Sequence, residues 1–130
     1  MWEYVGMGRT KEGLEIAIKK LDELRKVFDK DLYIPGDQKG MNIELDKAFR
    51  LNDFITMGKL MAYDAINRNE SCGGHFREEY QTEEGEAKRD DANYFYVACW
   101  DYKGADEAPE LIKEPLHYEA IKVQTRNYKS

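Results

Sequence analysis

Apolar residues recur at three- and four-residue steps along two long segments of the chain, and only an α-helix turns that period into one continuous apolar face. The first segment follows Thr10, a residue type that favours the N-cap position, and the second extends from about Asn42 to Arg68. The apolar positions of the first segment are Leu14, Ala17, Ile18, Leu21, Leu24 and Phe28. The break at 31–40 holds a proline and two glycines, which predicts a turn between two antiparallel helices.

The second segment has an apolar stripe that is wider than contact with one neighbouring helix requires. Three small residues in it would let another helix or a docked domain approach closely. The stripe consists of Leu51, Phe54, Ile55, Gly58, Met61, Ala62 and Ala65, with Leu45, Ala48, Phe49 and Ile66 to its side. Residues 2–5, followed by Gly6, are typical of the last turn of a further helix with a glycine C-cap. We therefore expect the native protein to extend upstream of Met1.

The helical pattern ends after Arg68. The segments 70–75 and 82–91 are rich in glycine and charged residues, so we expect loops there. Residues 94–100 form a β-prone run, and Ile121, Val123 and Thr125 alternate with polar residues, which predicts two strands. The residues between them, 103–115, include two prolines and several acids and should form an exposed connection. Because an isolated two-stranded ribbon is marginally stable, we expect another domain to cover it.

These patterns predict a mainly α fold: an antiparallel bundle of three helices, similar to a spectrin repeat, followed by a C-terminal two-stranded β extension. At 130 residues the chain is long enough for one hydrophobic core and short for two, so we expect a single domain at 1–130. The helical bundle and its following loop would occupy 1–91, and the β-ribbon extension would occupy 92–130.

Charge and hydropathy exclude two classes of partner. The formal net charge is -6 and the basic residues form no long run, so the chain has no electrostatic surface for nucleic acid. The longest apolar stretch, 94–100, is far shorter than the roughly 20 residues that cross a membrane. The N-terminus also lacks the layout of a signal peptide, so we expect a cytoplasmic protein with no direct membrane insertion and with both cysteines free.

The cysteine and histidine residues suggest two kinds of chemistry. Cys72 and His75, together with Cys99 and His117, have the side chains of a zinc site, although the second pair is irregularly spaced. Cys72 could instead act as a nucleophile with either histidine as its base, but the sequence offers no third orienting group. The alternative to both hypotheses is that the cysteines are ordinary core thiols and that the loop histidine only forms hydrogen bonds within the chain. We expect no metal-binding and no catalytic residue in this chain.

A more specific pattern follows the second helix. Glu70-Ser71-Cys72-Gly73-Gly74-His75, then Arg77, then Arg89-Asp90-Asp91, is similar to the Glu-Ser-Arg-Gly-Ala-His, Arg and Arg-Asp-Asp signature near the end of succinate dehydrogenase and fumarate reductase flavoproteins. Gly8-Arg9-Thr10 with Gly13-Leu14, and later Glu44-Leu45, resemble the entries to the two helices of that domain. Cys72 stands where the family has an arginine, and Gly74 where it has an alanine. A terminal domain of L-aspartate oxidase is a related alternative.

The resemblance implies that this chain is the C-terminal part of an FAD-dependent oxidoreductase of the tricarboxylic acid cycle and electron transport, which interconverts succinate and fumarate. In that family FAD sits in a Rossmann-like domain with a Gly-x-Gly-x-x-Gly loop, which is absent here, so this chain alone should bind no FAD and have no activity. The implied partners are the FAD-binding domain of the same chain and the iron-sulfur subunit, in a complex at the cytoplasmic face of the membrane.

The resemblance further implies that the loop from Glu70 to Arg77 contacts the FAD-binding domain. The expected inter-domain interface residues are Glu70, Ser71, Gly73, Gly74, His75, Arg77, Arg89 and Asp90. In the alternative interpretation Glu70, His75 and Arg77 satisfy backbone groups of their own chain. A free-standing helical protein-interaction module is the alternative from a different functional class. The sequence specifies neither the physiological direction of the reaction nor the oligomeric state.

Overall fold

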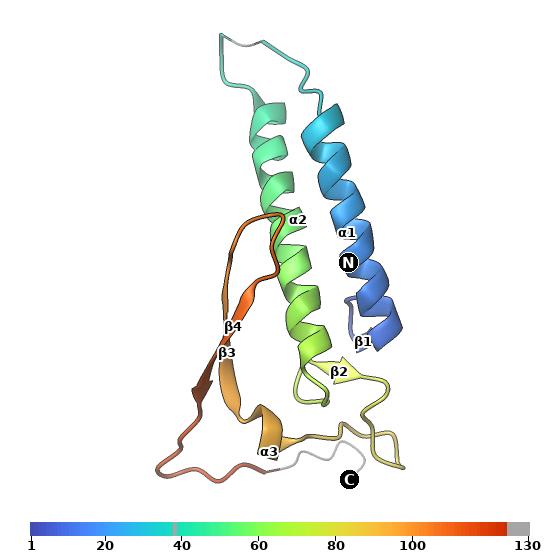
Figure 1. The fold of residues 1–130 in the computed structure, drawn as a ribbon, viewed down its shortest axis with the longest axis vertical. Helices are drawn as coiled ribbons and strands as arrows, with labels where there is room; N and C mark the ends of the chain where they lie inside the picture. Colours follow the sequence, from blue (N-terminus) through green and yellow to red (C-terminus); the bar gives the residue numbers. More distant parts are fainter. Residues whose placement is uncertain (38, 125–130) are drawn as a thin grey trace.

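The computed structural model describes residues 1–37 and 39–124 and has two long antiparallel helices as its main body (Figure 1). These are α1 (Lys11–Asp31) and α2 (Ile43–Asn67). The shorter elements are β1 (Gly8–Arg9), β2 (Phe76–Arg77), α3 (Asp91–Tyr94), β3 (Tyr96–Asp101) and β4 (Glu110–Pro115). The prediction of a mainly α bundle followed by a two-stranded β extension is confirmed, with the four-residue α3 as the third helix.

Both long helices begin where the sequence predicts, the first after the expected cap Thr10 and the second near Asn42. The Thr10 hydroxyl accepts a hydrogen bond from the amide N–H of Gly13 at 3.0 Å. The Asn42 side chain accepts from the amides of Glu44 and Leu45 and so satisfies two of the free N–H groups at the start of α2. The loop predicted between the helices lies between these two elements.

The core lies where the start of α1 packs against the end of α2, and several of its residues are small. Leu14 and Ala62 are fully buried, and Ala65 is 1% exposed. Together with Val5 and Ala17 they form the hydrophobic core cluster. Further along the pair, Arg25 on α1 donates a hydrogen bond of 2.7 Å to the Thr56 hydroxyl on α2. Apolar packing near the loop end of the helices is thus replaced in part by polar contacts.

The β extension differs from the prediction in its second strand. β3 pairs antiparallel with β4 in a register from Tyr96↔Pro115 to Asp101↔Glu110, so the second strand lies inside the predicted connection. Residues 121–124 are outside any strand, and Thr125 and Arg126 lie outside the described residues. A hairpin with a short loop, in which Gly104 has a φ of 119°, closes at a smaller entropic cost than pairing with 121–125 would. Pro115 is tolerated because it ends an edge strand.

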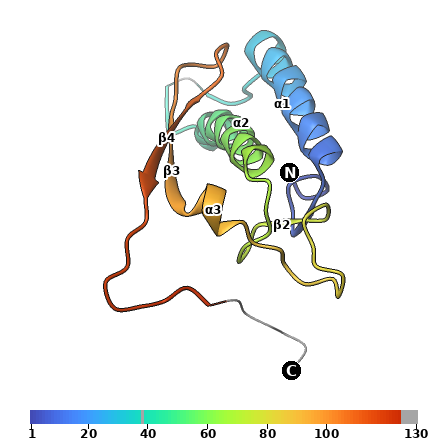
Figure 2. The ribbon, with the colours of Figure 1, turned by 60° about the horizontal axis from the view of Figure 1, so that its bottom comes forward.

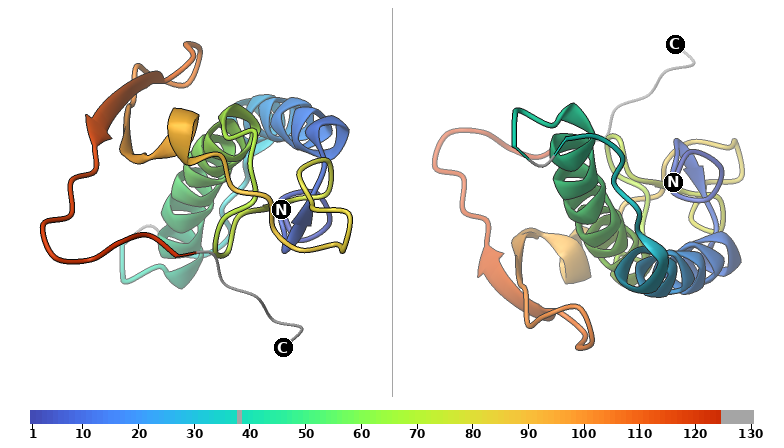
Figure 3. Two further views of the ribbon diagram at one scale, coloured as in Figure 1. Left: turned by 90° about the horizontal axis from the view of Figure 1, so that it is seen from below. Right: turned by 90° about the horizontal axis from the view of Figure 1, so that it is seen from above.

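The hairpin packs beside α2 on the side away from α1 (Figures 2 and 3). The Trp100 indole N–H donates to a carboxylate oxygen of Asp64 on α2 at 2.9 Å, and the alternate residues Tyr96, Ala98 and Trp100 are half-buried. The opposite face of the ribbon, with Val97 and Ile112 about half exposed, is uncovered. One face of the ribbon is therefore covered by the chain's own helix.

Truncation of a core leucine should test where the stability lies. We expect Leu14→Ala, at a fully buried position, to lower the free energy of unfolding by about 2–5 kcal/mol because it removes buried methyl groups and leaves a cavity. Leu24→Ala, in the same helix at a position 54% exposed, should lower it by less than about 1 kcal/mol. Urea denaturation followed by circular dichroism measures both. Equal losses would contradict the position of the core.

Candidate functional site

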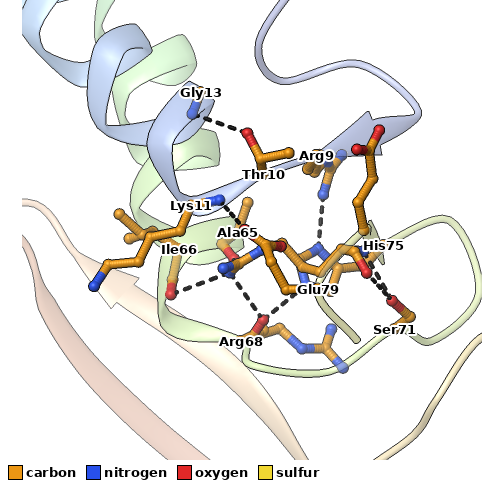
Figure 4. Close-up of polar contacts among 12 residues, drawn as sticks. Arg9, Thr10, Lys11, Gly13, Ala65, Ile66, Arg68, Ser71, His75 and Glu79 are labelled. Atoms are coloured by element: carbon orange, nitrogen blue, oxygen red, sulfur yellow. Dashed lines mark hydrogen bonds and ion pairs between the residues drawn. The ribbon is translucent and has the colours of Figure 1, made fainter. Parts of the chain in front are cut away.

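The predicted signature loop leaves the end of α2 and turns back against the start of α1 (Figure 4). β1 and β2 pair in parallel with Gly8 opposite Phe76 and Arg9 opposite Arg77, and the Glu78 amide donates to the Arg9 carbonyl at 2.9 Å. The loop thereby joins the N-terminal end of one helix to the C-terminal end of the other. Its polar side chains fill the space between these two ends.

Arg77 satisfies the last carbonyl groups of α2. Its side chain is 1% exposed, and Nη1 donates to the carbonyls of Ala65 at 3.1 Å, Arg68 at 3.4 Å and Ile66 at 3.5 Å. Nε donates to the carboxylate of Glu79 at 3.1 Å. The last four carbonyls of a helix lack partners within the helix and carry the negative end of its dipole, so a buried guanidinium stabilises them by both hydrogen bonding and charge.

Ser71 and Glu70 bind the loop to its own later residues. The fully buried Ser71 hydroxyl accepts from the Arg77 amide at 2.8 Å and donates to the Arg77 carbonyl at 3.0 Å. The buried Glu70 carboxylate pairs with Arg68 and accepts from the Asp90 amide at 3.0 Å. These contacts hold the segments 70–77 and 88–90 side by side.

His75 is held between two arginine residues. Nδ1 lies 2.8 Å from Arg9 Nη1, and Nε2 lies 2.9 Å from the Arg68 carbonyl oxygen. Because a guanidinium only donates and a carbonyl only accepts, these contacts require a neutral imidazole with its proton on Nε2. Burial of the ring lowers the pKa of His75 against the raising effect of the Arg68 carbonyl, and the charges of Arg9, Arg68 and Arg77 lower it further.

The tip of the loop, unlike these buried side chains, is exposed to solvent. The Cys72 and His75 backbones exchange two hydrogen bonds of 2.8 and 3.0 Å, which closes a tight turn over Gly73 and Gly74. Gly73 has a φ of 58°, a conformation that glycine adopts without steric cost. Both glycines are exposed, and a β-carbon built on either meets no atom within 4 Å. The tip is therefore a bare stretch of backbone on the surface.

Arg89 and Asp90 lie at the edge of this cluster. Arg89 pairs with Asp91 at 2.6 Å, and this hydrogen bond raises the pKa of Arg89. Asp90 caps α3 by accepting from the Asn93 amide at 3.3 Å. Both residues are half-buried, so each presents part of its surface to solvent beside the loop.

The structure thus brings all eight predicted interface residues together, but in two groups. Glu70, Ser71, His75 and Arg77 are buried and satisfy groups of their own chain, as the alternative interpretation of three of them held. Gly73, Gly74, Arg89 and Asp90 reach the surface. The prediction did not include Arg68, which pairs with Glu70, or Glu79, which pairs with Arg77. The sequence signal was the alternation of charged residues around Arg77, but this pattern does not specify which carboxylate pairs with the arginine.

The zinc and nucleophile hypotheses gain no geometric support. Both ring nitrogens of His75 are already hydrogen-bonded, so it can neither ligate a metal nor serve as a base for Cys72 without leaving these partners. Cys99 lies on the exposed face of the β extension. Within residues 1–37 and 39–124, no three His, Cys, Asp or Glu side chains are grouped to hold a metal ion. Over the same residues, no helix is long and apolar enough to cross a membrane.

Replacing the Arg77 guanidinium should measure its contribution to the fold. We expect Arg77→Met to lower the free energy of unfolding by about 3 kcal/mol, because buried carbonyls at the end of α2 lose their partner. Arg50→Met removes an exposed ion pair with Asp46 and should cost less than about 1 kcal/mol. Chemical denaturation of both variants provides the comparison; similar losses would show that Arg77 does not hold the helix end.

The neutral state of His75 should make folding sensitive to pH. Because burial lowers its pKa below the ordinary 6.5, the unfolded chain binds a proton at a higher pH than the folded chain. Stability should therefore be fully present above pH 6.5 and should fall below it until the folded state also protonates. His75→Gln keeps one acceptor and one donor and should remove this step, whereas His117→Gln, at an exposed position, should retain it. Urea midpoints between pH 5 and 8 distinguish the two.

Comparison with known proteins identifies the family. The family model for the fumarate reductase flavoprotein C-terminus matches residues 1–128. The fumarate reductase flavoprotein subunit of Serratia sp. is 35% identical over 94 residues, which are 72% of this chain and 15% of that protein. An FAD-dependent oxidoreductase of Methanocaldococcus jannaschii is 34% identical over 80 residues, which are 62% of this chain and 14% of that protein.

Solved structures agree with the sequence relatives. A variant of the FrdA subunit of E. coli quinol fumarate reductase superposes with a TM-score of 0.78 at 29% identity, over 94% of this chain and 20% of that chain. A quinol-fumarate reductase solved with menaquinol superposes with a TM-score of 0.73 at 28% identity, over 90% of this chain and 19% of that chain. The chain therefore spans less than a quarter of the relatives it matches, and it belongs to the family of fumarate reductase flavoprotein C-terminal domains.

Proposed function

We propose that this chain is the C-terminal domain of an FAD-dependent flavoprotein subunit that interconverts succinate and fumarate, and that it packs against the FAD-binding domain of the same subunit. The observation that carries the proposal is the match of the fumarate reductase C-terminal family to residues 1–128, combined with a glycine tip that the rest of the loop holds at the surface. In this function the domain contributes shape and position, while the chemistry belongs to the rest of the subunit.

The residues present do not form a cradle for FAD. A dinucleotide pyrophosphate binds to free amide N–H groups at the start of a helix. The Thr10 hydroxyl and the Glu79 carboxylate already accept from Gly13 and Lys11 at the start of α1. The carboxylate would also repel a phosphate group. We therefore place FAD in another part of the parent subunit; the Methanocaldococcus jannaschii relative is named as FAD-dependent, and the Serratia relative as a flavoprotein subunit.

The two groups of loop residues have different roles in the proposed interface. Glu70, Ser71, His75 and Arg77 position the loop by contacts within the chain. Gly73 and Gly74 form the contact itself, because a surface without side chains allows the neighbouring backbone to approach closely. Arg89 and Asp90 supply polar groups at its edge. The buried group is thus a support that keeps the contact surface in one conformation.

The proposal extends to the partners of the parent subunit. The quinol-fumarate reductases among the structural relatives act on a quinol, which points to a complex at the membrane. We propose an iron-sulfur subunit, which would pass electrons between the flavoprotein and the quinol site on the cytoplasmic face, as the further partner. The chain would reach the membrane through that complex.

A substitution at the glycine tip should test the interface. We expect Gly74→Glu to leave the stability of this chain unchanged, because its side chain enters open space. In the full-length subunit the same change should weaken domain contact and lower the flavin content about tenfold, which corresponds to roughly 1.4 kcal/mol. Flavin absorbance of the purified subunit measures it.

Gly40→Glu is the matched control. Gly40 is also exposed with open space around it, but it lies in the loop between α1 and α2 at the far end of the molecule. This variant should keep its flavin. Full flavin content in both variants would contradict the proposed interface at the loop tip.

A further inference from the structure

His75 joins the signature loop (70–77) to two different parts of the chain through the two nitrogens of its ring. Nε2 donates to the Arg68 carbonyl at 2.9 Å and so attaches the loop to the end of α2. Nδ1 accepts from Arg9 Nη1 at 2.8 Å and so attaches the loop to β1, just before the start of α1 (Figure 4). The residue is 8% exposed, so its ring depends on these two partners rather than on water.

The two contacts respond differently to a proton. An imidazolium carries a proton on both ring nitrogens and has no acceptor. The Nε2 donor remains, so the contact with the Arg68 carbonyl is kept and gains from the charge. On Nδ1 the acceptor becomes an N–H that faces the Arg9 guanidinium at 2.8 Å, where two donors of like charge repel each other. A proton on His75 thus breaks one attachment and leaves the other.

The charges around the ring strengthen this response. Each element packed against the ring supplies a cation that acts on it: Arg9 of β1, Arg68 after α2 and Arg77 of β2. Burial, followed by these charges, lowers the pKa of His75. The nearby carboxylates act on the arginines instead: Glu70 pairs with Arg68, Glu79 pairs with Arg77, and Asp64 on α2 partly offsets the burial that lowers the pKa of Arg9. A protonated ring would therefore face mainly positive charge.

The attachment that a proton breaks is a small one. β1 has two residues, which pair with the two residues of β2. Besides the contact between Arg9 and His75, the Glu78 amide donates to the Arg9 carbonyl at 2.9 Å, and the Lys11 amide donates to the Glu79 carboxylate. Few hydrogen bonds therefore oppose the separation of the loop from the start of α1.

This separation leaves the rest of the domain in place. Residues 6–9 are tethered on both sides, by Val5, which is 5% exposed in the core, and by Thr10, the cap of α1. The core cluster is built from the N-terminal turn and the two long helices. The loop stays on α2 because Arg77 donates to the Ala65 carbonyl at its end. The opening is thus a local parting of β1 from β2.

We propose that His75 is an acid-sensitive latch, which holds the signature loop on β1 when the ring is neutral and releases it when the ring is protonated. The loss of stability expected below pH 6.5 would then begin at the β1–β2 pairing, before the helix pair unfolds. The consequence for the parent subunit rests on the proposed function. Because the glycine tip belongs to this loop, acid would loosen the contact with the FAD-binding domain.

The size of the effect follows from the two states of the latch. A histidine released to solvent has a pKa of about 6.5 and is about 90% protonated at pH 5.5. The ring in the closed latch binds a proton less readily, because its pKa is lowered. The open fraction should therefore rise up to about tenfold when the pH falls from 7.5 to 5.5.

Hydrogen exchange of single amides in the full-length subunit tests the latch. The Glu78 amide loses its acceptor when β1 leaves, so its exchange, corrected for the intrinsic effect of pH, should be up to about tenfold faster at pH 5.5 than at pH 7.5. This exchange should depend little on low concentrations of urea, because a local opening exposes little surface. Exchange of the Ala62 amide, in the fully buried part of α2, requires unfolding of the helix pair and should depend steeply on urea.

Three variants separate the latch from other effects of acid. His75→Gln keeps one acceptor and one donor but does not titrate, so the pH effect on the Glu78 amide should disappear. His117→Gln, at an exposed position, is the matched control and should retain it. Arg9→Gln replaces the opposing donor by an amide that can turn its oxygen toward a protonated ring, so the pH effect should fall below about threefold.

An unchanged pH effect in His75→Gln or in Arg9→Gln would overturn the proposal. Exchange of the Glu78 amide that depends on urea as steeply as that of Ala62 would overturn it too, because the loop would then open only by global unfolding. Flavin content of the Gly74→Glu variant at pH 7.5 reports separately on the domain contact. Flavin retained there contradicts the interface alone, whereas a Glu78 amide that is insensitive to pH contradicts the latch alone.

Discussion

The contact between the buried Arg77 guanidinium and the carbonyl end of α2 supports the rest of the site. α2 ends at a loop inside the protein, and the Arg77 side chain, nine residues beyond the C-cap, donates to the Ala65 and Ile66 carbonyls and shares the Arg68 carbonyl with His75. Since Arg77 also belongs to β2, its position determines where the loop meets β1. Helix end, loop conformation and the start of α1 therefore depend on one cation.

The charge around that cation is unevenly distributed. Arg9, Arg68 and Arg77 surround His75, and two carboxylates, Glu70 beside Arg68 and Glu79 beside Arg77, offset part of their charge. The family pattern has a further arginine at the position of Cys72. Its replacement by a small thiol leaves the tight turn of the loop intact, since the Cys72 and His75 backbones still exchange their hydrogen bonds. The buried network therefore forms in this chain without an arginine at this position.

Helices were predicted well because their signals are local. Thr10 and Asn42 cap the helices where their side chains indicate, and the apolar period of α1 places Leu14 and Ala17 in the core. The second strand is misplaced in the prediction because 121–125 alternates more regularly than 110–115, whereas the pairing that forms depends on the shorter loop to be closed. The residues of the site were identified by their resemblance to a family signature, but their division into a buried and an exposed group depends on contacts between distant segments.

The pairing of β1 with β2 has a consequence for the order in which the molecule assembles. Arg9 and His75 are 66 positions apart, and Lys11 and Glu79 are 68 apart, so the loop can attach only after the α1–α2 hairpin has brought these segments together. Contacts of such long sequence separation pay the largest closure entropy, which the earlier helical contacts reduce. The signature loop should then become ordered after the α1–α2 pair has formed.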